Sequence, residues 1–223
     1  MALHHLLFRC PLCGHDPTQG ERDAASCSEC RASFTRLRKG GEIHIVREGS
    51  EPEAARVEDL MEKIEAFGGA LSSDTGPDGR IRRSAHVRMQ VSGTEEPLRF
   101  RGSVLGFVEQ LSDGENGVLH LQDTRLVFEP AGGAADASMS GEAVEESVGR
   151  GAPTAWDLLD IKAVQSASAA VQISPDRGGV VQFRFESDSP FRWEALLKGA
   201  LQKAYAGAGR GKISEFQPRI VSG

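Results

Sequence analysis

The sequence predicts a mainly β protein with some helix: a small cysteine-bearing head, a connecting helix, and a larger bent sheet or partial barrel that ends in a helix. Three observations lead to this fold class. All four cysteines lie within the first 30 residues. From residue 81 onward, apolar residues recur at every second position, which is the period of a half-buried strand. Residues 189–205 instead show helical spacing of apolar side chains, and we expect this helix to cover one end of the sheet.

The composition of the chain restricts the classes of partner that it suits and the cellular compartment in which we expect it. The chain has 223 residues, a formal net charge of −6 and a pI of about 5.6, so it is poorly suited to coat nucleic acid or an anionic membrane. No apolar run approaches the ~20 residues of a membrane-spanning helix, and the first nine residues are too short and too rich in histidine for a secretory signal. Cysteines clustered at metal-ligand spacing are typical of a reducing compartment. We therefore expect a cytoplasmic protein, with a peripheral membrane location left open.

The cysteines form two C-x2-C pairs, which predict a metal site. Cys10 and Cys13 make the first pair, and Cys27 and Cys30 make the second. Each pair can wrap a tight turn around one ion, and four thiolates complete a tetrahedral shell with no position left for water. The spacing thus predicts one structural zinc ion (Zn2+), with iron as the alternative because it also accepts four thiolates. The nearby histidines are not needed to complete the shell.

Short strands are expected to complete this head. Residues 33–37 and 43–46 alternate apolar and polar side chains on either side of a Gly-Gly turn. The pattern over about residues 8–46 resembles a zinc ribbon, and we assign residues 1–48 to this unit. A segment this short buries little apolar surface, so we expect metal binding to supply much of its folding energy.

Residues 49–79 are predicted to connect the head to the larger domain. Ser50, Pro52 and Glu53 have the pattern of a helix start, and apolar residues then recur at helical spacing as far as Phe67. Such an apolar stripe either binds a partner or packs on the chain's own domain, and packing is the commoner use. The residues that follow are polar and rich in turn formers, which is typical of a linker.

The larger domain is assigned to residues 80–206. Strands are expected at 81–91, 98–111, 117–121, 124–128, 155–164, 169–174 and 180–186. Asp113-Gly114 and Asn116-Gly117 are hairpin signals. We expect both tryptophans, which lie in this domain, to belong to its core.

Residues Gly117 to Phe128, with the sequence GVLHLQDTRLVF, resemble the G-x-L-x-L-T-x-x-R-L-x-F hairpin of GRAM domains. The segments Trp156–Ile161, Val171–Ile173 and Gln182–Phe185, followed by a helix, also match that family in order. GRAM domains belong to the pleckstrin-homology-like (PH-like) superfold, so the resemblance, over about residues 81–206, implies a bent sheet closed by a helix. It also implies a non-catalytic module that binds phosphoinositides or docks proteins.

Two segments depart from this pattern. Residues 130–153 are rich in Gly, Ala, Ser and Glu without periodicity, which predicts a flexible loop inserted between strands. Residues 207–223 form a tail whose mixture of apolar residues and proline would suit an added edge strand or strand addition to a partner.

Positively charged side chains gather near the start of the larger domain. Arg82, His86 and Arg88 share the even-numbered face of its first strand, and Arg99 and Arg101 follow on the next predicted strand. Guanidinium groups suit phosphate oxygens, so these residues form the candidate anion site. The alternative is an ordinary solvated strand face, which normally carries charge, and the acidic balance of the chain favours that alternative.

The sequence contains no recognisable catalytic motif. A G-x-S-x-G elbow, an H-E-x-x-H pair and a phosphate-binding P-loop are all absent, and with the cysteines assigned to metal no free thiol remains as a nucleophile. We expect a non-enzymatic adaptor that recognises a protein partner or an anionic lipid headgroup. Two alternatives stay open: a zinc-ribbon factor associated with nucleic acid or a polymerase, and a regulatory part of a lipid-metabolising enzyme such as an acyltransferase. Nucleic acid is the less favoured partner, because cations are few in the head.

Overall fold

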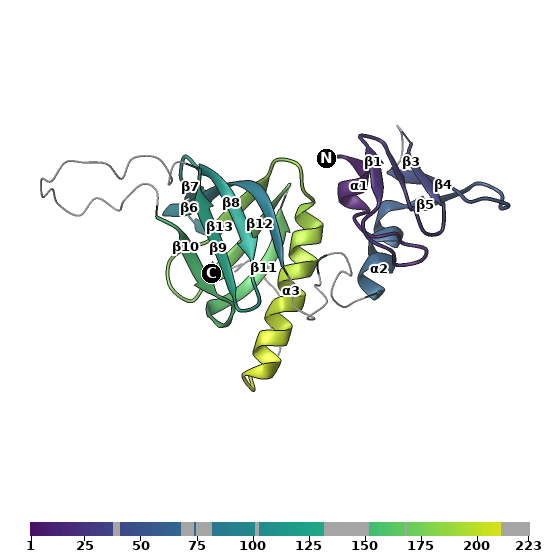
Figure 1. Cartoon of the computed structure of the whole chain (residues 1–223). Coiled ribbons are helices and arrows are strands. Elements are labelled where there is room, and N and C mark those ends of the chain that lie inside the picture. Colours follow the sequence, from purple (N-terminus) through teal and green to yellow (C-terminus); the bar gives the residue numbers. More distant parts are fainter. Residues whose placement is uncertain are drawn as a thin grey trace, which may run out of the picture.

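A computed structural model shows two antiparallel sheets of unequal size, each with its own helices (Figure 1). It describes residues 1–37, 41–67, 74, 82–100, 103–131, 152–167 and 169–210, with side chains described except at 94–109 and 167. The larger sheet is curled into a half-barrel and is followed by a long helix, which confirms the predicted mainly β fold class. The predicted inserted loop and tail lie largely outside the described residues.

The smaller sheet is a meander of five short strands in sequence order. Its strands are β1 (Gln19–Glu21), β2 (Ala24–Ser26), β3 (Ser33–Arg36), β4 (Glu42–Val46) and β5 (Glu53–Arg56). Phe34 of β3 and Ile43 and Ile45 of β4 are fully or almost fully buried, at alternate positions. The strands predicted at 33–37 and 43–46 are therefore confirmed, and their alternation places one face against the core.

The connecting helix begins later than the sequence predicts. Residues Glu53–Arg56 form β5, which pairs with β4, and helix α2 runs from Val57 to Ala66. The predicted helix start at Ser50 is wrong, and no side chain caps α2. A cap contributes only about 1 kcal/mol, whereas strand pairing satisfies several backbone groups of the segment at once.

Both helices of the smaller unit pack on their own sheet. The short helix α1 (Leu3–Leu6) contacts β1 and β2, and α2 contacts β5. Leu3, Leu60 and Ile64 are buried in the core cluster. The apolar stripe of α2 thus packs within the chain, as the commoner use of such stripes predicts.

The larger sheet has the strand order β10-β9-β8-β6-β13-β12-β11, and β7 pairs with the far half of β6. The strands are β6 (Arg83–Phe100), β7 (Ser103–Leu111), β8 (Glu115–Leu121), β9 (Arg125–Pro130), β10 (Thr154–Asp157), β11 (Ile161–Ala167), β12 (Ala170–Pro175) and β13 (Val181–Phe185). A single turn of 3₁₀ helix, η2 (Leu158–Asp160), joins β10 to β11. Consecutive strands β8 to β10 and β11 to β13 pair in two meanders, and β6 joins them at the centre of the sheet.

Two boundaries in this sheet differ from those expected. The segment predicted as one strand at 98–111 comprises the end of β6 and the whole of β7, so it folds back as a hairpin. Asp113-Gly114 lies between β7 and β8, as its turn signal predicts, but Asn116-Gly117 lies inside β8. A Cβ atom at Gly117 would come within 2.3 Å of the Glu129 carbonyl oxygen, so here glycine serves a close strand approach rather than a turn.

The inner face of the curled sheet is covered by helix α3 (Pro190–Gly207). The helix begins where the sequence predicts, because the Ser189 hydroxyl accepts the Arg192 backbone N–H at 3.1 Å. Trp193 is fully buried, and Trp156 is partly buried with its ring edge against Phe183 at 5.7 Å between centroids. Both tryptophans therefore belong to the core, as predicted.

Helix α3 lies on the side of the half-barrel that faces the smaller unit (Figure 1). Its neighbour across the junction is α1, and the buried apolar residues of both units form one continuous cluster. In the described part of the chain, no helix is long and apolar enough to cross a membrane.

Candidate metal centre and the ionic cluster at the junction

The fold brings the two cysteine pairs together at one end of the smaller sheet. The four Sγ atoms all lie within 4.8 Å of one another, and the Cys10–Cys30 and Cys13–Cys27 pairs are each 3.6 Å apart. A tetrahedral ion with metal–sulfur bonds of about 2.3 Å holds its sulfurs roughly 3.8 Å apart. The four cysteines are therefore placed to bind one metal ion.

The two cysteine turns have the same backbone design. The N–H of Cys10 donates to the His15 carbonyl at 2.8 Å, and the N–H of Cys27 donates to the Ala32 carbonyl at 2.9 Å, in both cases five residues ahead. The residue just after each pair has positive φ: Gly14 at 76° and Arg31 at 57°. Each turn thus presents two sulfurs from a closed loop of the same length.

Backbone N–H groups also point at the sulfurs. Burial raises the pKa of the Cys10 thiol, although it accepts hydrogen bonds from the backbone of Leu12 and Cys13. At Cys27 burial acts in the same direction, but the N–H groups of Cys30 and Glu29, together with hydrogen bonds to the Cys13 and Cys30 side chains, lower the pKa. Such N–H groups stabilise thiolate charge and orient the sulfur, which is what a metal ligand requires.

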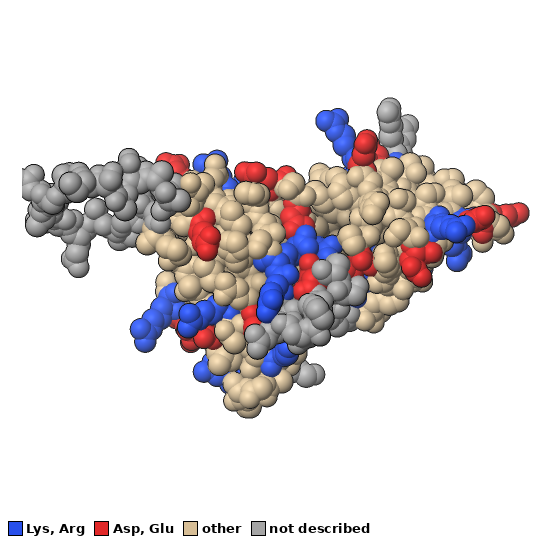
Figure 2. All heavy atoms as spheres, viewed as in Figure 1, with Lys and Arg blue, Asp and Glu red and all other residues tan. Residues whose placement is uncertain are grey.

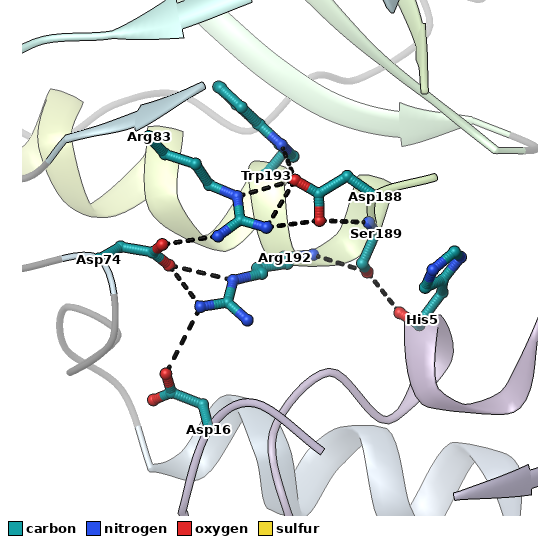
Figure 3. Close-up of polar contacts among 8 residues, drawn as sticks. All are labelled: His5, Asp16, Asp74, Arg83, Asp188, Ser189, Arg192 and Trp193. Carbon is teal, nitrogen blue, oxygen red and sulfur yellow. Dashed lines mark hydrogen bonds and ion pairs between the residues drawn. The ribbon is translucent and has the colours of Figure 1, made fainter. Parts of the chain in front are cut away.

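The first cysteine turn leads directly into a second polar cluster, at the junction of the two units. Asp16 follows Cys13 by three residues, and its side chain is only 1% exposed. It lies 3.6 Å from Arg9 on its own unit and 3.6 Å from Arg192 in the first turn of α3 (Figure 3). The segment that carries the metal ligands therefore contacts the helix of the larger unit through a buried ion pair.

Asp74, from the segment that joins the two units, lies at the centre of this cluster. One carboxylate oxygen accepts a hydrogen bond from Arg83 at 2.6 Å, and the other accepts two from Arg192, at 3.0 and 2.7 Å (Figure 3). Its backbone carbonyl also accepts the N–H of Arg82 at 2.9 Å. Asp74 thus binds the start of β6 and the start of α3 at once.

Asp188 completes the cluster on the side of the larger unit. It accepts two hydrogen bonds from Arg83, at 2.8 and 2.6 Å, and one from Trp193 Nε1 at 2.7 Å. Burial alone would lower the pKa of Arg83, but its hydrogen bonds and the charges of Asp188 and Asp74 raise it instead. The next residue, Ser189, donates its hydroxyl to the backbone carbonyl of His5 across the junction (Figure 3).

The junction also contains a cavity of about 300 Å³. Its walls include His5, Phe8, Thr18 and parts of the ionic cluster. Burial, followed by the charge of His4, lowers the pKa of His5 and thus favours its neutral form. The lining carboxylates of Asp74 and Asp188 are paired with Arg83 and Arg192, so these walls present no net charge to a ligand.

Three residues of the predicted anion site are described with their side chains, and two are not. His86 and Arg88 lie on the exposed outer face of β6, two residues apart as the alternation predicts, and Arg82 is exposed just before that strand. The side chain of Arg99 and all of Arg101 lie outside the described residues. On the face that Figure 2 shows, basic and acidic side chains are interspersed, notably over the seam between the two units.

Sequence analysis did not find the junction residues Asp16, Asp74 and Asp188. Each is a single aspartate in a polar, turn-rich segment, where a solvated side chain is the usual expectation. Their arginine partners are up to 118 residues away in the sequence, and no local pattern connects them. The structure also adds Arg184 of β13 to the outer face, directly opposite Arg88.

No known protein family matches the sequence in a scan of family models, and no curated protein is similar enough to serve as a relative.

The two cysteine turns predict unequal responses to substitution at their positive-φ residue. Gly14→Ala should lower stability by about 1–2 kcal/mol, because a side chain disfavours this conformation and the new Cβ would lie 2.8 Å from the Phe67 ring. Arg31→Gly should change stability by less than about 0.5 kcal/mol, because relief of backbone strain offsets the greater freedom of the unfolded chain. Urea unfolding with metal present measures both. A Gly14→Ala protein as stable as wild type would contradict the shared backbone design.

The junction cluster predicts that replacing one buried aspartate by the uncharged asparagine strongly lowers the free energy of unfolding. Asp74→Asn leaves Arg83 and Arg192 with too little negative charge in a buried setting, so we expect a loss of about 3 kcal/mol in the free energy of unfolding. The control is Glu48→Gln, which breaks an ion pair with Arg31 whose side chains are 76% and 79% exposed. That change should cost less than about 0.5 kcal/mol. Equal losses in the two variants, measured by urea unfolding, would show that Asp74 is not structurally special.

Proposed function

We propose that this protein is a non-enzymatic adaptor in which a zinc ribbon is fixed to a GRAM/PH-like module that recognises a protein partner. The observation that carries the proposal is the continuous path from the metal site to the larger unit, through Cys13, Asp16 and Arg192. A closed four-sulfur site suits a stabilising metal, because no coordination position remains for a substrate or water. The buried ionic cluster then makes the metal-bound head a fixed part of the binding module.

Zinc is the proposed ion because the donor set is four sulfurs at tetrahedral spacing. The ion would neutralise thiolate charge and hold the two cysteine turns together, and the small head would depend on it for folding. The GRAM/PH-like assignment is supported by a curled sheet of eight strands, in which the paired strands β6 and β7 are followed by two meanders and a covering helix.

A protein is the favoured partner because the chain is acidic and its visible charges are mixed. Binding to an anionic bilayer by charge takes clusters of roughly 4–8 basic residues, and each Lys or Arg adds only about 1 kcal/mol. Acidic residues stand among the exposed cations here, so charge alone gives weak membrane attraction.

The path from the cysteine site to the junction cluster predicts that tryptophan fluorescence of the larger unit responds to removal of the metal ion. Both tryptophans belong to the larger unit, and Trp193 donates to Asp188 in the junction cluster. The purified chain should contain about one zinc per molecule, and its removal by a chelator should shift the tryptophan emission to longer wavelength as the cluster loosens. Addition of zinc should reverse the shift. Iron in place of zinc, or four freely reactive thiols in the native protein, would refute the zinc assignment, and an unchanged emission would refute the coupling.

The adaptor proposal is tested by affinity capture from the native host with the tagged full-length chain. We expect one defined protein to co-purify in a fixed ratio and to rebind the chain when both are purified. Parallel measurements use phosphoinositide-containing vesicles, phosphatidylserine vesicles, and DNA and RNA duplexes at low salt. Binding to vesicles or to nucleic acid without a protein partner would contradict the proposal and favour the corresponding alternative.

A further inference from the structure

The outer face of the curled sheet carries two adjacent cross-strand rows of polar residues. The first, which we name the glutamine row, has one glutamine on each of four neighbouring strands. Its members, in strand order, are Gln90 (β6), Gln182 (β13), Gln172 (β12) and Gln165 (β11). The second, which we name the arginine row, lies two residues away on β6, β13 and β12 and continues onto β8. Its members are Asn116 (β8), Arg88 (β6), Arg184 (β13) and Ala170 (β12).

The glutamine row is internally satisfied. Gln165 donates to Gln172 at 2.7 Å, Gln172 to Gln182 at 2.9 Å, and Gln182 to Gln90 at 3.0 Å. Gln90 in turn donates to the Ser112 carbonyl at 3.0 Å. Gln182 is only 8% exposed although it lies on the outer face. This row therefore fixes the strands side by side and offers few free groups to a ligand.

The arginine row, unlike the glutamine row, is not satisfied by hydrogen bonds among its own side chains. Arg88 and Arg184 are directly opposed on neighbouring strands and both are exposed, and neither side chain makes an ion pair or hydrogen bond within the described part of the chain. Like charges in this position destabilise a sheet. Their flanking residues, Asn116 and Ala170, carry no negative charge to offset them. By contrast, Arg83 and Arg192 at the junction are saturated by aspartates.

The shape of the surface keeps the arginine row open. A Cβ atom at Gly114 would lie 2.7 Å from Arg88 Nε, so a residue larger than glycine there would displace the Arg88 side chain. On the other side, the strand neighbour of Arg184 is the small, buried Ala170, and Arg184 itself is exposed. The row thus places two exposed arginines directly opposite each other on neighbouring strands, whose backbones are about one strand spacing of ~5 Å apart.

We propose that the arginine row binds carboxylate side chains of an acidic segment on the partner protein, an inference that rests on the adaptor function proposed above. Guanidinium forks match carboxylates in geometry, and a bound carboxylate removes the repulsion between the two arginines. A membrane or polynucleotide fits less well, because Glu129 and Glu186 are exposed on the same side of the sheet.

The test uses the full chain and a labelled probe peptide of alternating Glu and Ser, with a Gln–Ser peptide as the neutral comparison. The variant is Arg88→Gln/Arg184→Gln. The matched control is Arg125→Gln/Arg177→Gln, which removes the same charge from exposed arginines in β9 and in the β12–β13 turn. By fluorescence anisotropy at low salt, we expect the Glu–Ser peptide to bind the first variant at least tenfold more weakly than wild type, and the control within twofold. No binding by wild type, or equal weakening in both variants, would overturn the proposal.

Two further readouts separate this inference from its alternatives. Thermal unfolding of Arg88→Gln/Arg184→Gln should be unchanged or shifted upward, because repulsion is relieved, whereas a clear downward shift would mean that the pair is structural. Phosphoinositide vesicles that bind through the same two arginines while the peptide does not would replace the protein segment with a lipid surface. If the partner captured from the host still binds the variant with unchanged affinity, the arginine-row inference fails while the adaptor function stands.

Discussion

The carboxylate of Asp74 is the contact on which the arrangement of the two units depends. It is buried in the segment between them, and a buried charge is costly unless it is paired and hydrogen-bonded. Arg83 from β6 and Arg192 from α3 supply that pairing, and Arg192 extends it to Asp16 beside the metal ligands. Because each partner would be left uncompensated without the others, the head, the linker and the larger unit are held in one geometry.

This constraint separates two kinds of charged site in the molecule. At the junction every strong cation meets a carboxylate, so the cavity there has neutral, satisfied walls. On the outer face Arg88 and Arg184 have no such partners and repel each other. A net attraction for an anion is therefore expected where the fold leaves positive charge uncompensated, not in the most enclosed space.

The sequence was sufficient wherever a feature is local. Cysteine spacing predicted the clustered sulfurs, Ser189 and Pro190 predicted the start of α3, and period-two alternation placed His86 and Arg88 on one outer face. It failed wherever a distant segment decides the outcome. The segment 53–56 has the residues of a helix start but pairs with β4 instead. Asp74 and Arg184 gain their roles from partners 118 and 96 positions away, which no local pattern encodes.

The junction cluster and the arginine row also differ in how they depend on the metal ion. A bound metal ion would hold the two cysteine turns together, and Asp16 is positioned directly after the first of them. The arginine row belongs to a sheet with its own apolar core, including Val87, Phe183 and Trp193, and the glutamine row fixes its strands from outside. Metal loss should therefore loosen the junction while leaving the binding face formed. Under the proposed adaptor function, the head would fix the position of the larger unit rather than build its ligand site, in keeping with four cysteines that leave no open coordination position.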